Sequence, residues 1–322
     1  MTDVIERPVR ARPRYVLAAL WTSALVVGVL PDLFGGLDSY PPFTQVVAFR
    51  PWLAAGAAVL ALLLGVVTAF RRRMWPVLVG TLVVALTAGF AVLPRTIAAP
   101  VPVEGRPLTV MAANVLRARA DPQALADAIR ETRPDVVSMP EAGDRYGPRI
   151  EPLVTPLGYR VLDTGGGVGV IVSERLGDVS VRMGTEFGLE PYAEITGGGL
   201  GDVTVVAFHA ASPVQGRMAA WRTDLAMLSR WCAGPGRVVI AGDLNATLDH
   251  SALRAGSAGC TDAAADRGAG LVPTWGPTAR TTVFGPQIDH VLATPGIDPS
   301  AFAVRDLPGS DHRIVVATLL VR

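Results

Sequence analysis

The chain has 322 residues, enough for one large domain or two modest ones, and 50% of them are hydrophobic, a high share for a soluble enzyme. Its formal net charge of +1 excludes the strongly basic surface that usually marks a nucleic-acid-binding domain. All 29 basic residues are arginine, which excludes a P-loop lysine, a Schiff-base lysine and a Ser-Lys dyad.

Three uncharged apolar segments lie in the first third of the chain. They cover residues 15–30, 52–70 and 75–93, and the last two approach the roughly 20 residues that a helix needs to cross a bilayer. These segments predict three transmembrane helices in a membrane anchor of residues 1–93. A cleaved signal peptide is the alternative for the first segment, although no small-residue cleavage site directly follows it.

Arginines flank these segments unevenly. Four precede the first segment and three lie at 71–73, whereas the loop of residues 31–51 has one arginine and two aspartates. Because arginine-rich loops stay in the cytoplasm, we expect the N-terminus and residues 71–73 to be cytoplasmic. After three spans, the rest of the chain then lies outside, so we expect a multi-pass protein of the cell membrane with an extracytoplasmic C-terminal domain.

Spaced prolines predict an extended linker over residues 94–107, and a domain follows at 108–322. Alternating short apolar runs and amphipathic segments predict an α/β fold with hairpins. The expected helices cover residues 122–131, 149–157 and 214–231. The expected strands cover residues 108–116, 136–140, 169–173, 192–196, 203–209, 237–241, 288–293, 302–306 and 314–321.

Polar residues follow several of these strands, where sheets of this kind usually carry their sites. Asn114 and Glu141 come after two apolar strands, and their oxygens are ligands that a hard divalent cation accepts. Taken singly, each is also compatible with a solvated strand end or a simple turn.

The segment Gly242-Asp243-Leu244-Asn245 gives the strongest single signal. Asp243 and Asn245 are two residues apart, so an extended backbone places both side chains on one side. An Asx turn and an N-glycosylation sequon are the alternatives. The buried-type strand before this segment favours a functional site, because it delivers a carboxylate and an amide together.

Histidines and aspartates complete the candidate set. His209 ends an apolar strand, where a single histidine is more often structural than catalytic. Asp289 and His312 lie in separate segments and, if they meet, form the carboxylate–imidazole pair that fixes a tautomer and raises basicity. Asp311, next to His312, offers a further metal ligand.

Taken in order, the Asn, Glu, His, Gly-Asp-x-Asn, Ile-Asp-His and Ser-Asp-His elements resemble the endonuclease/exonuclease/phosphatase family over residues 108–322. The resemblance implies a four-layer sandwich of two mixed sheets between helices, with a metal-dependent phosphoesterase site at one edge. In many members a glutamine precedes the metal-binding glutamate, whereas here that position is Pro140.

The resemblance also implies residue roles. Glu141 and Asn114 would bind Mg²⁺ or Mn²⁺, with Asp311 as a further ligand, and His209 would contact the scissile phosphate. Asp243 would position or deprotonate the attacking water beside Asn245. His312, oriented by Asp289, would stabilise the transition state or act as acid or base, so the base remains open between Asp243 and His312.

We therefore expect a phosphoesterase that uses in-line attack by water, without a covalent intermediate. Its expected partners are the bilayer and a phosphate-ester substrate, which is a lipid phosphate, a nucleotide or a nucleic acid; no protein partner is predicted. The alternatives are an extracellular nuclease and a non-catalytic, membrane-tethered binding module. In an oxidising compartment, Cys232 and Cys260 are expected to form a disulfide, with two buried free thiols as the alternative.

Overall fold

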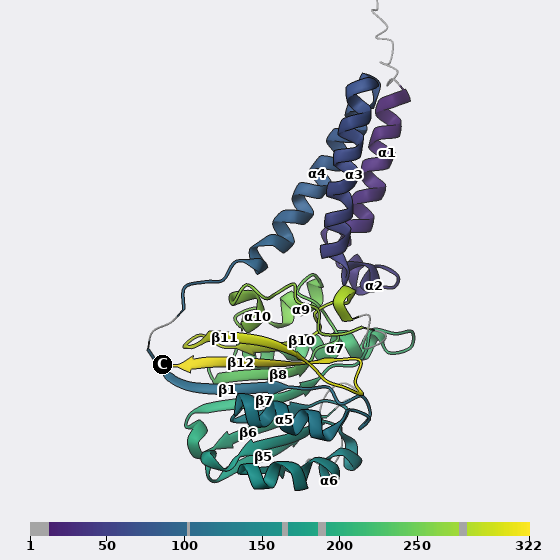
Figure 1. Ribbon diagram of the computed structural model, residues 1–322. Helices are drawn as coiled ribbons and strands as arrows, with labels where there is room; N and C mark the ends of the chain where they lie inside the picture. Colours follow the sequence, from purple (N-terminus) through teal and green to yellow (C-terminus); the bar gives the residue numbers. More distant parts are fainter. Residues whose placement is uncertain (1–12, 102–103, 163–166, 186–190, 277–281) are drawn as a thin grey trace, which may run out of the picture.

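The computed structural model describes residues 13–101, 104–162, 167–185, 191–276 and 282–322. A bundle of three helices projects from one side of a two-sheet domain (Figure 1). The bundle consists of α1 (Pro13–Val29), α3 (Arg50–Phe70) and α4 (Trp75–Val92). Short elements join them, namely η1 (Pro31–Leu33), η2 (Leu37–Ser39), α2 (Phe43–Val47) and η3 (Arg72–Met74), and η4 (Leu93–Thr96) follows α4.

The expected three spans are only partly supported. Two helical segments, Arg50–Phe70 and Arg72–Thr96, are long and apolar enough to cross a membrane. The third helix, α1, has 17 residues in the described part of the chain and falls short of the roughly 20 that a span needs. Length and composition thus identify two candidate spans rather than three.

The C-terminal domain, which is expected to be catalytic, contains two six-stranded mixed sheets. The first sheet has the order β11-β12-β1-β2-β4-β3, and the second has the order β5-β6-β7-β8-β10-β9. Each has one parallel pair, β1–β2 or β7–β8. The strands are β1 (Arg106–Ala112), β2 (Val136–Met139), β3 (Tyr159–Leu162), β4 (Gly169–Ser173), β5 (Val179–Gly184), β6 (Tyr192–Gly197), β7 (Val203–His209), β8 (Arg237–Asp243), β9 (Thr261–Asp262), β10 (Asp289–Ala293), β11 (Ile297–Asp306) and β12 (Arg313–Val321).

Helices cover the outer face of each sheet. On the first sheet lie α5 (Pro122–Thr132) and α6 (Gly143–Val154), and on the second lie α7 (Met218–Met227), α8 (Ser229–Cys232) and α9 (Ser251–Gly256); α10 (Ala263–Asp266) follows β9. A third apolar core, which includes Val110 and Val239, fills the space between the sheets. The expected two mixed sheets between helices are confirmed.

Three local expectations were wrong. The helix expected at 149–157 begins at Gly143, because Tyr146, Ile150 and Val154 repeat every four residues and bury one face. Strands β3, β5 and β9 were not expected. All three lie at sheet edges, and β5 exposes polar side chains such as Arg182. The helix expected at 214–231 is divided into α7 and α8.

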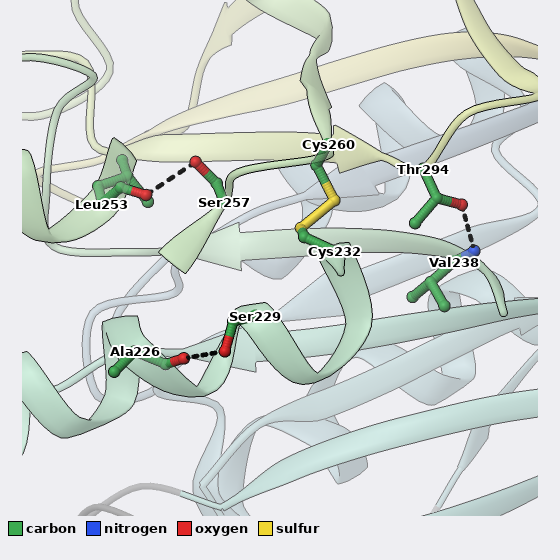
Figure 2. The surroundings of a disulfide bond; sticks show 8 residues. All are labelled: Ala226, Ser229, Cys232, Val238, Leu253, Ser257, Cys260 and Thr294. Atoms are coloured by element: carbon green, nitrogen blue, oxygen red, sulfur yellow. Dashed lines mark hydrogen bonds between the residues drawn. A yellow bond between two sulfur atoms is a disulfide. The ribbon is translucent and has the colours of Figure 1, made fainter. Parts of the chain in front are cut away.

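The expected disulfide between Cys232 and Cys260 is present (Figure 2). It joins the end of α8 to the residue before β9, at the end of β8 opposite Asp243. Gly259 has φ +98°, and a Cβ there would lie 2.4 Å from the Cys232 carbonyl oxygen. The close approach of these two segments therefore depends on glycine.

The linker does not stand free of the catalytic domain. Ala98 forms an isolated β-bridge with Arg267, and the Ala99 N–H donates to the Asp266 carbonyl at 2.8 Å. Nearby, the Gly270 N–H donates to the Arg95 carbonyl at 3.0 Å. Residues 95–99 of the expected linker thus contact the domain.

The anchor loop, residues 30–49 between α1 and α3, also contacts the catalytic domain. Its Asp38 carboxylate accepts hydrogen bonds from the Ser251 N–H at 2.6 Å and the Ser251 hydroxyl at 2.7 Å. The His250 ring donates from Nε2 to the Thr44 carbonyl at 3.0 Å. Next to this loop, Arg50 is buried and pairs with Asp249 at 3.1 Å. The anchor and catalytic domain therefore share a polar, partly buried interface.

Candidate active site

Strand register brings three candidate residues together on the second sheet. His209 is paired with Asp243 across the parallel strands β7 and β8. Asp289 is paired with Asp243 across the antiparallel strands β8 and β10. His209 and Asp243 end their strands, whereas Asp289 begins its strand. An antiparallel strand begins where its neighbour ends, so all three residues lie at one edge.

The first sheet delivers its candidates to the same edge. Asn114 and Glu141 follow the parallel strands β1 and β2, and His312 directly precedes β12, which is antiparallel to β1. The Ser310 hydroxyl joins two of these segments, because it donates to the Asn114 carbonyl at 2.8 Å and accepts from the His312 N–H at 3.0 Å. Asp289 and His312 thus lie at strand starts, at the same edge as the strand ends that carry the other candidates.

Asp243 lies at the centre of this edge and is 1% exposed. Its Oδ2 accepts a hydrogen bond from Asn114 Nδ2 at 2.9 Å. The same oxygen is 3.6 Å from His312 Nε2 and 3.7 Å from His209 Nε2. Ligand atoms of Glu141, His209 and Asp243 all lie within 4.8 Å of one another. The predicted carboxylates and imidazoles therefore meet in one place.

Asp243 and Asn245 face each other through a turn, not through an extended backbone. Strand β8 ends at Asp243, and Asn245 has a left-handed φ of +48°. The Asn245 N–H donates to Asp243 Oδ1 at 2.8 Å, which is the Asx-turn bond that the sequence interpretation set aside. Asp243 Oδ2 remains turned toward the site, 3.4 Å from Asn245 Nδ2. One carboxylate thus shapes the turn and faces the site.

Asp289 and His312 form the expected pair. His312 Nδ1 lies 2.9 Å and 3.2 Å from the two carboxylate oxygens of Asp289, and both side chains are buried. Burial by itself would lower the pKa of His312, but the Asp289 and Asp243 carboxylates outweigh it and raise the pKa to about 10. Burial also raises the pKa of Asp243 above its ordinary value. The raised pKa of His312 favours the imidazolium form beside these two carboxylates.

Glu141 is held at the edge by a strained backbone. Its φ of +62° is unusual for a residue other than glycine, and such conformations cluster at functional sites. The Arg117 N–H donates to Glu141 Oε2 at 3.1 Å, and Asn114 Nδ2 donates to Oε1 at 3.2 Å. The Asn114 oxygen accepts from the Leu116 N–H at 2.9 Å. Asn114 thus bridges two carboxylates through its amide nitrogen, and its oxygen faces the backbone.

A pocket of about 530 Å³ opens over these residues. Its lining includes the arginines Arg117, Arg119, Arg145 and Arg217, which favour an anionic ligand. Trp275 also lines the pocket and donates from Nε1 to Asp311 Oδ2 at 3.1 Å. The sequence analysis did not assign the arginines or Trp275 to the site. Only the run Pro273-Thr274-Trp275 before the Asp289 segment could have pointed to the tryptophan.

The sequence of this chain matches a known protein family. The model of the Endonuclease/Exonuclease/phosphatase family matches residues 111–312, more than half of the chain. The chain belongs to this family. The match begins within β1 and ends at His312, so it includes every candidate site residue. No curated protein matches the chain.

Solved structures with the endonuclease/exonuclease/phosphatase fold resemble this domain. One is from Beutenbergia cavernae, with a TM-score of 0.51, 23% identity, and 67% of this chain and 72% of that chain covered. Another, from Bacteroides thetaiotaomicron, has a TM-score of 0.51, 12% identity and coverages of 68% and 100%. D. rerio TDP2, solved with a single-strand DNA product, has a TM-score of 0.51, 18% identity and coverages of 66% and 98%. At these identities the likeness establishes the fold alone.

Enzymes of this family typically use divalent metals, and the donor set of this chain fits such an ion. Glu141 and Asp243 offer carboxylate oxygens close to His209, and hard divalent cations prefer oxygen ligands. Asp311 Oδ1 is buried and has no hydrogen-bond partner among the described residues. A buried carboxylate oxygen without a donor is costly unless a cation pairs with it. The site can therefore hold a divalent metal ion.

Proposed function

We propose that the protein is a divalent-metal-dependent phosphoesterase that hydrolyses phosphodiester or phosphomonoester bonds by in-line attack of water at the outer face of the membrane. One observation carries the proposal. Asp243, His209 and the Asp289–His312 pair converge with Glu141 in a pocket that arginines also line. This arrangement supplies sites for a cation, a positioned water and an anionic substrate.

We assign the metal to Glu141 and Asp311, which flank strands of the first sheet and line the pocket together. Asp243, whose oxygen also lies near Glu141, is assigned to the attacking water instead. When bound, Mg²⁺ or Mn²⁺ would neutralise charge on the phosphoryl oxygens. Asn114 would keep Glu141 in place through its hydrogen bond of 3.2 Å, even if its oxygen does not coordinate the ion. Asp311 is held by the Trp275 indole on one oxygen and leaves the other for the ion.

Asp243 and Asn245 would hold the attacking water. The Asp243 carboxylate accepts the water proton as the oxygen of water bonds to phosphorus and the ester P–O bond breaks. His312, as an imidazolium held by Asp289, would stabilise charge on the phosphoryl group and donate a proton to the departing alkoxide. His209 would contact a non-bridging phosphoryl oxygen. This division of roles makes Asp243 the base and His312 the acid.

The membrane location is part of the proposal. The arginine-rich turn of residues 71–73 joins α3 and α4 at the end of the bundle away from the catalytic domain (Figure 1). With that turn in the cytoplasm, the anchor loop and the catalytic domain lie on the outer side. The topology uses α1 as a third, shorter span.

A nuclease is the second candidate. The arginines in the pocket suit a polyanion, and the similarly folded D. rerio TDP2 was solved with a single-strand DNA product. The near-neutral net charge of the chain argues against tight binding of a long nucleic acid. We therefore rank a small or membrane-held phosphate ester above DNA or RNA.

The test is hydrolysis by the purified full chain in detergent, with and without Mg²⁺ or Mn²⁺. Substrates are DNA, RNA, a phosphoinositide, sphingomyelin and a chromogenic phosphodiester. We expect metal-dependent hydrolysis of at least one of them. Glu141→Gln should require much more metal or be inactive, since a neutral oxygen is a poorer ligand.

Asp243→Asn should retain metal binding and lose about 10²–10⁴-fold in rate, as expected when a general base is removed. Arg305→Met, at a surface ion pair on β11, is the matched control and should keep full activity. Near-wild-type activity of both site variants would refute the mechanism. Absence of metal-dependent hydrolysis of every substrate would refute the function.

A further inference from the structure

A second cavity adjoins the catalytic pocket. It has a volume of about 560 Å³, within the roughly 300–1,000 Å³ of most ligand sites. One wall comes from the anchor, through Thr44, Gln45, Ala48 and Phe49. The facing wall comes from the catalytic domain, through the segment 212–215 after β7 and through Pro286 and Ile288. The cavity therefore exists only where the anchor and the domain meet.

The cavity borders the proposed reaction centre. Ser212, Asn245 and Trp275 line both the catalytic pocket and this cavity. The Asn245 amide nitrogen is 3.4 Å from both Asp243 Oδ2 and His209 Nε2. A molecule whose phosphoryl group contacts these catalytic side chains is thus one side chain away from the second cavity.

The cavity offers mainly apolar contacts. Phe49, Ala48, Val214, Pro213, Pro286 and Ile288 contribute apolar surface to its walls. Two of its polar side chains already have partners: Gln45 donates to the Pro213 carbonyl at 2.7 Å, and His250 donates to the Thr44 carbonyl at 3.0 Å. A hydrocarbon group fits this lining better than a group with many hydrogen-bonding atoms.

Apolar side chains also surround the cavity on the side of the helical bundle. Phe49 is 37% exposed and Val214 is 50% exposed. Nearby, Val283 and Phe284 are 65% and 64% exposed, and the Phe284 ring lies 5.3 Å from the ring of Trp52 on α3. Exposed apolar groups beside helices that are suited to a bilayer indicate contact with lipid.

We propose that this cavity binds the hydrocarbon part of a lipid phosphate ester while its phosphoryl group occupies the catalytic pocket. The inference rests on the proposed phosphoesterase function and names its substrate class. The anchor then has a second role beyond attachment, because α2 and Phe49 form one wall of the lipid subsite. Contacts of Asp38 with Ser251 and of Arg50 with Asp249 keep that wall in place.

The test compares matched esters with the full chain in detergent micelles. Long-chain phosphatidic acid, a monoester, is paired with glycerol phosphate, and long-chain phosphatidylcholine, a diester, with glycerophosphocholine. A single-stranded oligonucleotide is the third class. We expect kcat/KM for a long-chain lipid to exceed that for its chain-free counterpart by on the order of tenfold or more, because an apolar pocket favours the ligand with more hydrocarbon. If the phosphatidic acid pair shows this preference, the substrate is a monoester; if the phosphatidylcholine pair shows it, the substrate is a diester.

Val214→Asp should remove that preference, because it places a carboxylate in the apolar wall, while hydrolysis of the chain-free ester stays unchanged. Val101→Asp makes the same substitution at an exposed valine outside the cavity and should change neither rate. Equal loss on both esters in Val214→Asp, or no preference for chains in the wild type, would overturn the inference. If the wild type prefers the oligonucleotide and Val214→Asp removes that preference, the cavity binds a nucleotide base and not a hydrocarbon chain.

Binding without turnover gives an independent measurement. Phosphatidylcholine with a photoactivatable acyl chain should label residues 43–49 or 212–215 in the wild type and much less in Val214→Asp. If the wild type hydrolyses no ester but shows this labelling, the proposed function fails and the lipid subsite stands. Labelling confined to the membrane-facing helices would refute the subsite even if hydrolysis is observed.

Discussion

The contact between anchor and catalytic domain depends on Arg50, and its removal has a calculable cost. The Arg50 side chain is 2% exposed. Its guanidinium donates to the Val29 carbonyl at 3.1 Å and to Asp249 at 3.1 Å, and it pairs with Asp32. Arg50→Met keeps the apolar stem and removes every one of these polar contacts.

The size of this cost depends on the ion pairs that Asp249 and Asp32 keep in the Arg50→Met variant. Asp249, 1% exposed, still pairs with Arg95, and Asp32 still pairs with Arg254 at 2.8 Å. Neither carboxylate is left alone, so the cost lies near the lower end of the 3–5 kcal/mol expected for a broken buried pair, about 3 kcal/mol. For a domain of this size, about 3 kcal/mol corresponds to a fall in Tm of roughly 6–12 °C.

Thermal unfolding of the full chain in detergent measures this change. The matched control is Arg305→Met, which breaks a pair whose side chains are 41% and 58% exposed. Such exposed pairs contribute about 0–1 kcal/mol, so the control should shift Tm by at most about 4 °C. If Arg50→Met lowers Tm no more than Arg305→Met does, the buried network does not hold the anchor to the domain.

Further predictions concern redox state, topology and pH. Replacing Cys232 and Cys260 by serine opens a loop with a sequence separation of 28 and should lower the free energy of unfolding by about 3–4 kcal/mol in the chain-entropy model. In the wild type, two free thiols detected by titration of the unreduced, denatured protein would contradict the disulfide. Alkaline phosphatase fused after Gly105 should be active, and a well-expressed, inactive fusion would reverse the topology. Burial lowers the pKa of His250 below 6.5, so the neutral ring stabilises the fold fully above pH 6.5, and this contribution is lost as the pH falls through the lowered pKa. His250→Gln should therefore make the fall of Tm in acid less steep. An unchanged dependence of Tm on pH would show that His250 does not contribute to acid unfolding.

Local patterns in the sequence determined the parts of the fold whose side chains have one clear environment. Buried strands such as β7 and β8 are continuous apolar runs, and their ends are marked by His209 and Asp243. The edge strands β3 and β5 lack that pattern and were not predicted, because β3 is short and only partly buried and β5 exposes every second side chain over most of its length. Three apolar segments were also visible, although within the described residues only two helical segments have the length of a span.

The residue types of the site were recognisable from their order along the chain, but their geometry was not. The sequence placed Asp289 and His312 in separate segments, and only the antiparallel pairing of β8 with β10 and β1 with β12 brings both to the edge that holds Asp243. Likewise, Asp243 and Asn245 meet through a left-handed turn that the spacing of two residues does not specify.

The contact between the anchor and the catalytic domain was decided by tertiary structure alone. Asp38 and Ser251 are 213 residues apart, and Arg50 and Asp249 are 199 apart, so local spacing carries no signal for either contact. Each of these side chains, taken in its own segment, is an ordinary polar residue in a loop or at a helix end. Sequence patterns specify which residues are apolar, charged or capable of chemistry; long-range packing decides which of them share a cavity, because that depends on how distant segments meet in space.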